Sequence, residues 1–526
     1  MNYTYSEDSS FDSDSETDSV NDPIGNNNPL RTEKGALTLA TTQDALVDCF
    51  YKTIRGIDDT YLRKLLEDSW AYSPLDTIKL IFFIRDIRGK GKGEKKIFHQ
   101  ACKWLIDVHS DAIKHNYQHV PFYGCYKDWY EIFLQTRYEK AILKALARQL
   151  RSDLITISEN DDKRDKKDGY FSFLWKLPKI TEHVSVSLAW KWTPSENSHY
   201  DKGQYKGTVS KLCKILGMSK KEYRKAGTFM RGYLNIVEAK MCGKEWEEID
   251  FSKVPSRAMN IYKKAYSKHQ TERFGKYIED VTSGKAKMNT GTLQPHEIIT
   301  QALSNHKDDP IVEAQWVSFL KGLKDKGLSF DNTVSVVDTS GSMNGIPRQV
   351  AYALGLVTSH FCTGLFHDKW IEFSSQAKLH KFPNGTLHQK IKSINSIIDS
   401  TNIKSVFDLI LNTYEMFDVP AEKQIKRVFI FTDGQWDSMV SHADLTTFQG
   451  IEKMYTDAGY TRPTLIFWNL RAGTIDFPVQ ADTPDTALVS GFSSDLLQLF
   501  LEGGDMNPLS LVHKAIRDER YDRVIL

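Results

Sequence analysis

The residues best suited to chemistry form the spacing D-x-S-x-S in the C-terminal part of the chain. Asp338, Ser340 and Ser342 come directly after the β-branched run 333–337. The spacing places three short oxygen ligands on one tight loop, and Gly341 permits the turn. Such a loop is suited to binding a cation through hydroxyl and carboxylate oxygens.

A second pair of oxygen ligands is available further along the chain. Asp433 ends the apolar run 428–432, and Thr401 precedes a helical pattern. Hydroxyls and carboxylates without histidine or cysteine are hard ligands, which suit Mg²⁺ or Mn²⁺ in an octahedral shell that keeps several waters. These residue types therefore suit a hard divalent metal ion.

The elements that must position this loop alternate between strands and helices. A helix is predicted from Pro347 to about Phe361, and the run from Val406 to Phe417 has its apolar residues on one face. Alternating strands and helices predict a mostly parallel, doubly wound α/β sheet, with ligands at the carboxyl ends of the strands. The strand-like runs are 333–337, 370–374, 377–382, 427–432, 464–469 and 486–490.

The run Asp338-Thr-Ser-Gly-Ser342, with Thr401 and Thr432-Asp433-Gly434, resembles the metal-ion-dependent adhesion site of von Willebrand factor A domains. The resemblance implies that Ser340 and Ser342 bind the metal directly and that the aspartates act largely through water. Thr401 would bind directly or through water, and one position would stay open for an acidic group of a partner. The alternative is a structural loop without metal, as in degenerate copies of the domain.

The part before residue 329 has a helical pattern. Apolar residues repeat at helical spacing in three stretches: 98–106, 142–150 and 312–320. Strand-like alternation is confined to 184–188, and 158–169 is typical of an exposed loop. Short helices separated by polar loops favour stacked antiparallel pairs, a solenoid of the HEAT kind, over residues 35–328.

A basic, glycine-rich stretch joins two apolar helices at residues 83–94. No G-x-x-x-x-G-K-[ST] pattern fits it, so it is not a Walker loop. Its backbone amides and basic side chains could bind phosphate at a helix start, or the stretch could be a turn with Arg85 and Asp86 paired internally. The candidate nucleic-acid-binding residues here are Arg85, Arg88, Lys90, Lys92, Lys95 and Lys96.

Two further basic regions have a composition that suits single-stranded nucleic acid. One is the lysine- and arginine-rich run 211–225, and the other, 253–287, has nine bases against three acids, interleaved with aromatic residues. Solvated faces of amphipathic helices are the alternative. The candidate residues are Lys221, Arg224, Arg257, Lys285 and Lys287.

Two segments resemble the TROVE module of Ro-type RNA-binding autoantigens. They are 85–94, similar to R-D-x-R-G-G-K-G-E, and 120–128, similar to V-P-x-Y-G-x-W-x-D with Tyr126 in place of Trp. The chain also resembles, over most of 35–526, plant, fungal and giant-virus proteins without an assigned activity that join such a module to an A domain. The resemblance implies RNA binding on a basic face of a helical ring.

Composition and charge exclude several classes of protein. The 526-residue chain has no apolar run of about 20 residues, and residues 1–30 have no secretory signal. Six scattered cysteines without C-x-x-C favour reduced thiols and an intracellular location, or a virion if the source is a giant virus. Residues 1–22 hold seven acids and no base, so 1–34 is predicted to be a disordered acidic tail.

The charge of the remaining chain is uneven. Residues 23–329 carry a net charge of +14. The predicted A-type domain, residues 329–526, is acidic: it has 17 bases against 23 acids from residue 330 on. We expect a non-catalytic protein whose helical module binds RNA and whose A domain binds Mg²⁺ and an acidic protein. The alternatives are a protein-interaction scaffold without nucleic-acid binding, and metal-assisted phosphoester hydrolysis, which lacks a second metal and an obvious general base.

Overall fold

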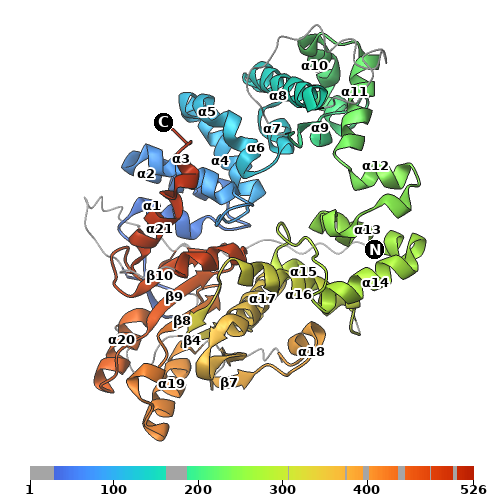
Figure 1. Ribbon diagram of the computed structural model, residues 1–526. Helices are drawn as coiled ribbons and strands as arrows, with labels where there is room; N and C mark the ends of the chain where they lie inside the picture. The colour runs from blue at the N-terminus through green and yellow to red at the C-terminus, as the bar shows by residue number, and fades with distance from the viewer. Residues whose placement is uncertain are drawn as a thin grey trace, which may run out of the picture.

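The computed structural model describes residues 29–526, apart from 33, 161–185, 306, 374–375, 395–401, 436, 438–444, 474–475 and 502–505. A helical region precedes residue 330 and an α/β region follows it (Figure 1). The helices of the first region are α1 (Ala45–Lys52), α2 (Asp59–Tyr72), α3 (Pro74–Arg85), α4 (Lys95–Val108), α5 (Ser110–Asn116), α6 (Val120–Tyr123), α7 (Tyr126–Phe133), α8 (Glu139–Asn160), α9 (Ala189–Trp192), α10 (Thr208–Leu216), α11 (Lys220–Tyr233), α12 (Val237–Cys242), α13 (Ser256–His269), α14 (Thr271–Thr282), α15 (Pro295–Ser304) and α16 (Pro310–Asp325).

Local sequence explains where these helices begin and which face they bury. Ser219 and Glu222 form a capping box that satisfies free amides at the start of α11. The side chain of Asp44 accepts hydrogen bonds from the second and third amides of α1. The apolar stripe predicted in α4 is buried along its whole length.

The α/β region is built on a six-stranded sheet in the order β10-β9-β8-β4-β6-β7. Every pairing in it is parallel except that of β7, the edge strand, with β6. β4, β8, β9 and β10 are almost entirely buried, which explains their continuous apolar sequences. The strands are β4 (Thr333–Val337), β6 (Lys369–Glu372), β7 (Lys378–Lys381), β8 (Arg427–Thr432), β9 (Thr464–Asn469) and β10 (Thr486–Ser490), with β3 (Phe330–Asp331) and β5 (Cys362–Thr363) forming a separate pair.

Helices flank this sheet. α17 packs against β4, β6 and β8, and in Figure 1 the sheet lies between α17 and the pair formed by α19 and α20. The helices are α17 (Ile346–Phe361), α18 (Leu387–Lys392), α19 (Ile403–Phe417), α20 (Thr447–Asp457) and α21 (Pro508–Ile516). The expected α/β architecture with a mostly parallel sheet is thereby confirmed.

Both ends of the helical region rest on the α/β region. At one end α1 contacts β10 and α21, and α21 also contacts α3; at the other end α15 contacts α17 and α18. Between these contacts the helices follow an arc that leads away from the sheet through α8–α11 and returns to it (Figure 1). One hydrophobic core runs through both regions, and a smaller cluster joins α12–α14 to α16.

A few expected features differ or lie outside the described residues. Phe417 was expected on the buried face of α19 but is 69% exposed, because it is the last residue of the helix. Residues 29–31, within the predicted disordered tail, form β1 (Pro29–Arg31), which pairs with β2 (Leu37–Leu39). Residues 1–28, most of the predicted loop 158–169 and the start of the strand-like run 184–188 are not described, and the described residues 186–188 of that run are not in a strand.

The structure also bears on membrane insertion and on the thiols. Among the helices of the described residues, none is both long and apolar enough to cross a bilayer. All six cysteines lie in described segments and have free thiols.

Candidate metal centre

Two aspartates lie side by side at the carboxyl edge of the sheet. Asp338 follows β4 and Asp433 follows β8, and these strands are parallel neighbours in which Val337 pairs with Phe431. The backbone amide of Asp338 donates to the carbonyl of Phe431 (3.0 Å), so the ladder continues to the start of the loop. This edge is where open parallel sheets bind their ligands.

Hydrogen bonds hold the D-x-S-x-S loop in place around Asp338. Its Oδ1 accepts from the amide of Ser340 (2.9 Å), and its Oδ2 accepts from the hydroxyl of Thr432 (2.8 Å). The hydroxyl oxygens of Ser340 and Ser342 are 3.0 Å apart. The structure thus brings together four of the five predicted ligands, and the fifth, Thr401, lies outside the described residues.

The electrostatics of this cluster favour a cation. Asp338 is fully buried and Asp433 is 1% exposed. Burial, together with the neighbouring charge of Asp433, raises the pKa of Asp338 to about 6. Asp433 Oδ2 is buried and has no hydrogen-bond partner in the described chain. A buried carboxylate oxygen of this kind is costly unless a cation or a donor satisfies it.

The donor chemistry fits a hard divalent ion. Within the described segments no three side chains among His, Cys, Asp and Glu gather into a metal-binding group. A metal held here would therefore depend on two aspartates, two serine hydroxyls and water. Such an all-oxygen, water-rich shell matches Mg²⁺ or Mn²⁺ better than zinc.

Two arginines that the sequence interpretation missed contact the same loop. Arg348, in the first turns of α17, donates from Nη2 to the carbonyl of Ser340 (3.0 Å). Arg471, which follows β9, donates from Nη1 to the carbonyl of Ser342. The position of Arg471 after a predicted strand could have placed it at the carboxyl edge, whereas Arg348 carried no signal beyond a helical pattern.

Two basic residues of the glycine-rich stretch, Arg85 and Lys92, lie inside the protein. Arg85 is bound by the buried carboxylate of Asp128 (Nη2–Oδ2, 2.9 Å). Lys92 is 1% exposed and donates to the carbonyls of Phe50 and Thr53 and to the hydroxyl of Ser490 in β10. Burial lowers the pKa of Lys92 to about 7. Neither side chain faces solvent where a phosphate could reach it.

Asp86 in this stretch also has an internal role. Its carboxylate is fully buried and binds Arg520 (Nη2–Oδ1, 2.8 Å) and the hydroxyl of Tyr521 (3.0 Å). A Cβ at Gly89 would lie 2.4 Å from the Asp86 carboxylate, so a glycine is needed there for close approach. Arg85 and Asp86 are thus both paired inside the protein, as the alternative of a structural turn has it: Arg85 with Asp128 and Asp86 with Arg520.

The other candidate nucleic-acid residues are on the surface, and several have acidic partners. Arg88 donates to the carbonyls of Phe122 (3.0 Å) and Gly124 (2.5 Å). The ion pairs are Lys90–Asp518 (3.6 Å), Lys95–Glu131 (2.6 Å), Arg224–Glu196 (3.9 Å) and Arg257–Glu297 (3.5 Å). Lys96, Lys221, Lys285 and Lys287 are exposed.

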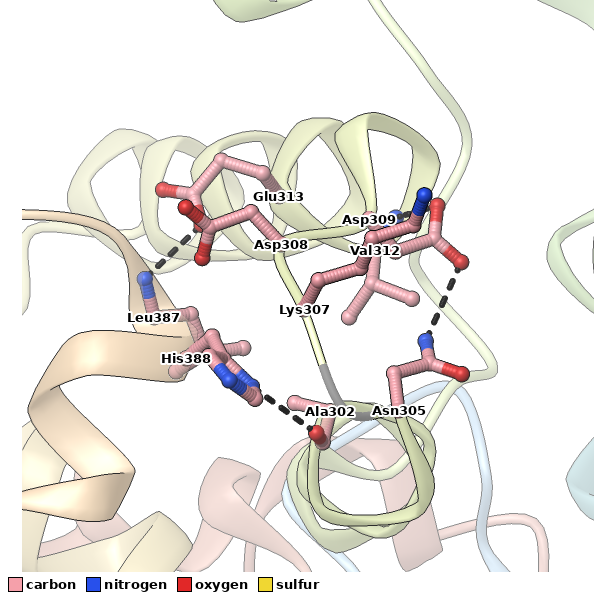
Figure 2. Close-up of a pocket in the computed structure, with 9 residues that line it drawn as sticks. All are labelled: Ala302, Asn305, Lys307, Asp308, Asp309, Val312, Glu313, Leu387 and His388. Atoms are coloured by element: carbon pink, nitrogen blue, oxygen red, sulfur yellow. Dashed lines mark hydrogen bonds between the residues drawn. The ribbon is translucent and has the colours of Figure 1, made fainter.

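A separate small pocket lies where α18 meets the α15–α16 connection (Figure 2). Glu313 accepts a hydrogen bond from the first amide of α18, that of Leu387 (2.8 Å), and His388 Nδ1 lies 3.2 Å from the carbonyl of Ala302. Burial raises the pKa of Glu313. These groups satisfy one another, so the pocket serves to dock α18 on the helical region. Its lining residues are Ala302, Asn305, Lys307, Asp308, Asp309, Val312, Glu313, Leu387 and His388.

Comparison with known proteins gives matches along most of the chain. Residues 32–145 and 210–328 match the domain of unknown function DUF2828, and residues 332–522 match the domain of unknown function DUF7788. The uncharacterized protein L728 of Acanthamoeba polyphaga mimivirus is 31% identical over 513 residues, which cover 91% of this chain and 86% of that protein.

Proposed function

The chain belongs to the same family as the mimivirus protein L728, and we propose that it is a non-catalytic binding protein with a metal centre. In this proposal the C-terminal region is a von Willebrand factor A-type domain that holds one Mg²⁺ or Mn²⁺. The metal, when bound, supplies a Lewis-acidic position to which an acidic group of a protein partner binds.

One observation carries the proposal: two buried carboxylates are adjacent, and neither forms an ion pair with a lysine or arginine of the described residues. Asp433 has an unsatisfied buried oxygen, and its charge contributes to the raised pKa of Asp338. Two adjacent buried carboxylates repel each other, and a divalent cation between them would convert this repulsion into attraction. The hydroxyls of Ser340 and Ser342, 3.0 Å apart on the same edge, supply further oxygens.

The five predicted ligands have different proposed roles in holding the metal. Ser340 and Ser342 would bind the metal directly, and Thr401 is retained as a proposed fifth ligand. Asp338 orients the loop through Ser340 and Thr432 and carries negative charge to the site. Asp433 contributes the oxygen that lacks a partner.

Isothermal titration calorimetry with Mg²⁺ tests this function on the full chain. We expect one site in the wild type, at least tenfold weaker binding in Asp433→Asn and Ser340→Ala, and loss of the Mg²⁺-dependent rise in melting temperature. Asp457→Asn, an exposed carboxylate on α20 paired with Lys453, is the matched control and should bind normally. Equal Mg²⁺ affinity in Asp433→Asn and the wild type would refute the proposal.

A second candidate function is RNA binding by the helical region, interpreted as a TROVE-like module of HEAT-like repeats. It is favoured by the exposed lysines on α4, α11 and the segment after α14, and by the arc that the helices form (Figure 1). The alternative is a surface that only docks proteins. In a filter-binding titration with structured RNA, RNA binding requires an affinity that falls steeply with salt.

The variants for that titration are chosen among exposed residues, because substituting a buried residue would also change the fold. Substitution of Arg85 or Lys92 would disturb packing, so it cannot separate the two readings. Lys96→Gln, Lys221→Gln, Lys285→Gln and Lys287→Gln combined should weaken RNA binding, while Lys453→Gln on α20 is the control. A flat salt response, or equal binding by the combined variant, would favour the protein scaffold.

A further inference from the structure

Two arginines contact the loop that carries the proposed serine ligands. Arg348 of α17 donates from Nη2 to the carbonyl of Ser340 (3.0 Å), and Arg471, which follows β9, donates from Nη1 to the carbonyl of Ser342. Among the described residues, neither guanidinium forms an ion pair with a carboxylate, and each makes only this one side-chain hydrogen bond. The described residues therefore leave both positive charges at this edge uncompensated.

Both guanidinium groups keep donors for a ligand. A guanidinium has five N–H donors in a fixed fork, and each of these two uses one on a loop carbonyl. Nε of Arg348 is buried without a partner, so the donors that Arg348 offers to an external ligand are those on its Nη atoms. Arg471 is exposed. The planar fork matches the oxygens of carboxylate and phosphate, so this edge is suited to binding an anion.

The charge at this edge favours a ligand with two negative charges. The carboxylates of Asp338 and Asp433 together neutralise one divalent metal ion, and the two arginines then leave an excess of two positive charges. A single carboxylate of a partner would compensate half of this excess. A phosphate monoester carries a charge of about −1.5 to −2 at pH 7, so it would compensate nearly all of it.

The number of acceptor oxygens favours the same ligand. A carboxylate has two oxygens, so a carboxylate at the open metal position keeps one oxygen for two guanidinium groups on different elements. A phosphate monoester has three terminal oxygens. One of them can occupy the metal position while each of the other two accepts hydrogen bonds from one arginine.

The charge of the surrounding region favours a phosphorylated protein over nucleic acid as the source of this phosphate. From residue 330 on, the chain has 17 bases against 23 acids, which repels a polyanion. The internal phosphodiesters of nucleic acid carry one charge each, so only a terminal phosphate would match the site. A peptide with one phosphorylated side chain supplies the dianion without a charged backbone.

We propose that the metal centre recognises a phosphorylated serine or threonine of a protein partner. One phosphate oxygen occupies the open metal position, and Arg348 and Arg471 donate to the other two. This inference rests on the proposed metal-dependent function and specifies the acidic group that this function requires. Phosphorylation of the partner then switches binding on.

The test compares fluorescent glycine- and alanine-based peptides that differ only at one central residue, which is phosphoserine, glutamate or serine. Binding to the full chain is measured in saturating Mg²⁺. We expect the phosphoserine peptide to bind roughly tenfold more tightly than the glutamate peptide, and chelation of Mg²⁺ to abolish its binding. Equal or tighter binding of the glutamate peptide would overturn the inference. Tighter binding of a 5′-phosphorylated tetranucleotide would also overturn it, because the site would then belong to nucleic acid.

Arginine variants test the proposed contacts. Arg348→Gln with Arg471→Gln should remove most of the preference for phosphoserine over glutamate. Arg348→Lys with Arg471→Lys should retain part of it, because the charge remains but the fork is lost. Arg427→Gln, at the start of β8 and thus at the opposite edge of the sheet, is the matched control and should keep the full preference. A preference that survives the double glutamine substitution would contradict the proposed contacts.

A direct measurement locates the phosphate relative to the metal. With substoichiometric Mn²⁺ in place of Mg²⁺, addition of the protein should broaden the ³¹P signal of the phosphoserine peptide, and this added broadening should disappear in Asp433→Asn. If calorimetry shows no metal binding, the proposed function fails and the inference fails with it. If metal binds but the protein adds no broadening, only the phosphate inference is refuted.

Discussion

At Asp338 and Asp433, burial and mutual repulsion act on the same two carboxylates. A protein normally avoids such an arrangement, because a buried charge without a counterion is strongly unfavourable. Here the ladder between β4 and β8 fixes both backbones, so the two aspartates start from the same buried edge of the sheet. The simplest consequence is competition between protons and a cation for these oxygens.

Binding of Mg²⁺ should therefore depend on pH. The pKa of Asp338 is raised to about 6 from an ordinary value of 3.8. Below about pH 6 a proton must leave before the metal binds, so affinity should fall up to tenfold per pH unit on acidification. Calorimetry at pH 5 and 7.5, with folding checked by circular dichroism, measures this; equal affinities would contradict it.

The same pKa shift also determines how the stability of the metal-free protein changes with pH. Because the folded-state pKa lies above the unfolded value, the folded state holds its proton longer. The contribution of Asp338 to stability is then present below pH 3.8 and is lost as pH rises through about 6. Saturating Mg²⁺ should remove this loss.

At the level of elements, α17 contacts both β4 and the D-x-S-x-S loop that follows it. Gly355 of α17 faces Val337, the last residue of β4, and a Cβ at Gly355 would lie 2.6 Å from Val337 Cγ2. Helix and strand therefore touch at the residue before Asp338. A shift of α17 would be transmitted to the loop through this contact.

Gly355→Ala should lower the free energy of unfolding by about 1–3 kcal/mol through overpacking, and should weaken Mg²⁺ binding. Gly275→Ala in α14 is the control, because no atom lies within 4 Å of the added methyl. There alanine should raise stability by about 0.5–1 kcal/mol. Urea denaturation measures both, and a stabilised Gly355→Ala variant would show that the contact can relax.

Across the whole molecule, ion pairs and backbone contacts tie the last residues of the chain to the first helices. Arg520 and Tyr521 bind Asp86, and the side chain of Asn116 bonds the backbone of Ile525 at both its amide and its carbonyl. Lys92 extends from the helical region to Ser490 at the end of β10. Together with the shared core, these contacts predict that the two regions unfold as one unit.

Asp86→Asn should destabilise the protein by ~3 kcal/mol, because it removes the partner of a largely buried arginine. Calorimetric unfolding should remain a single transition at a lower temperature. Asp457→Asn, whose carboxylate is exposed, should change stability by less than about 1 kcal/mol. Two separate transitions in either variant would show that the regions unfold independently.

The periodicity of apolar residues made much of the architecture predictable. Contacts between residues far apart in the sequence could not be predicted in this way. The predicted strands 333–337, 427–432, 464–469 and 486–490 coincide with β4, β8, β9 and β10, because runs of buried apolar residues are a local signal. Four of the five predicted ligands are adjacent for the same reason: strand ends predict edge positions. The burial of Lys92 was not predictable, since its partner Ser490 is nearly 400 residues away.

Contacts at both ends of the helical arc make the polypeptide difficult to divide. A cut near residue 328 would leave the first fragment with the apolar surfaces of α1 and α15 uncovered, and would leave the second without the helices that cover β10 and α17. Expressed alone, each fragment would expose apolar surface that is buried in the intact protein. Each fragment should therefore aggregate or bind chaperones. Co-expression of the two pieces should instead rebuild a heterodimer, with the former intramolecular joint serving as its interface.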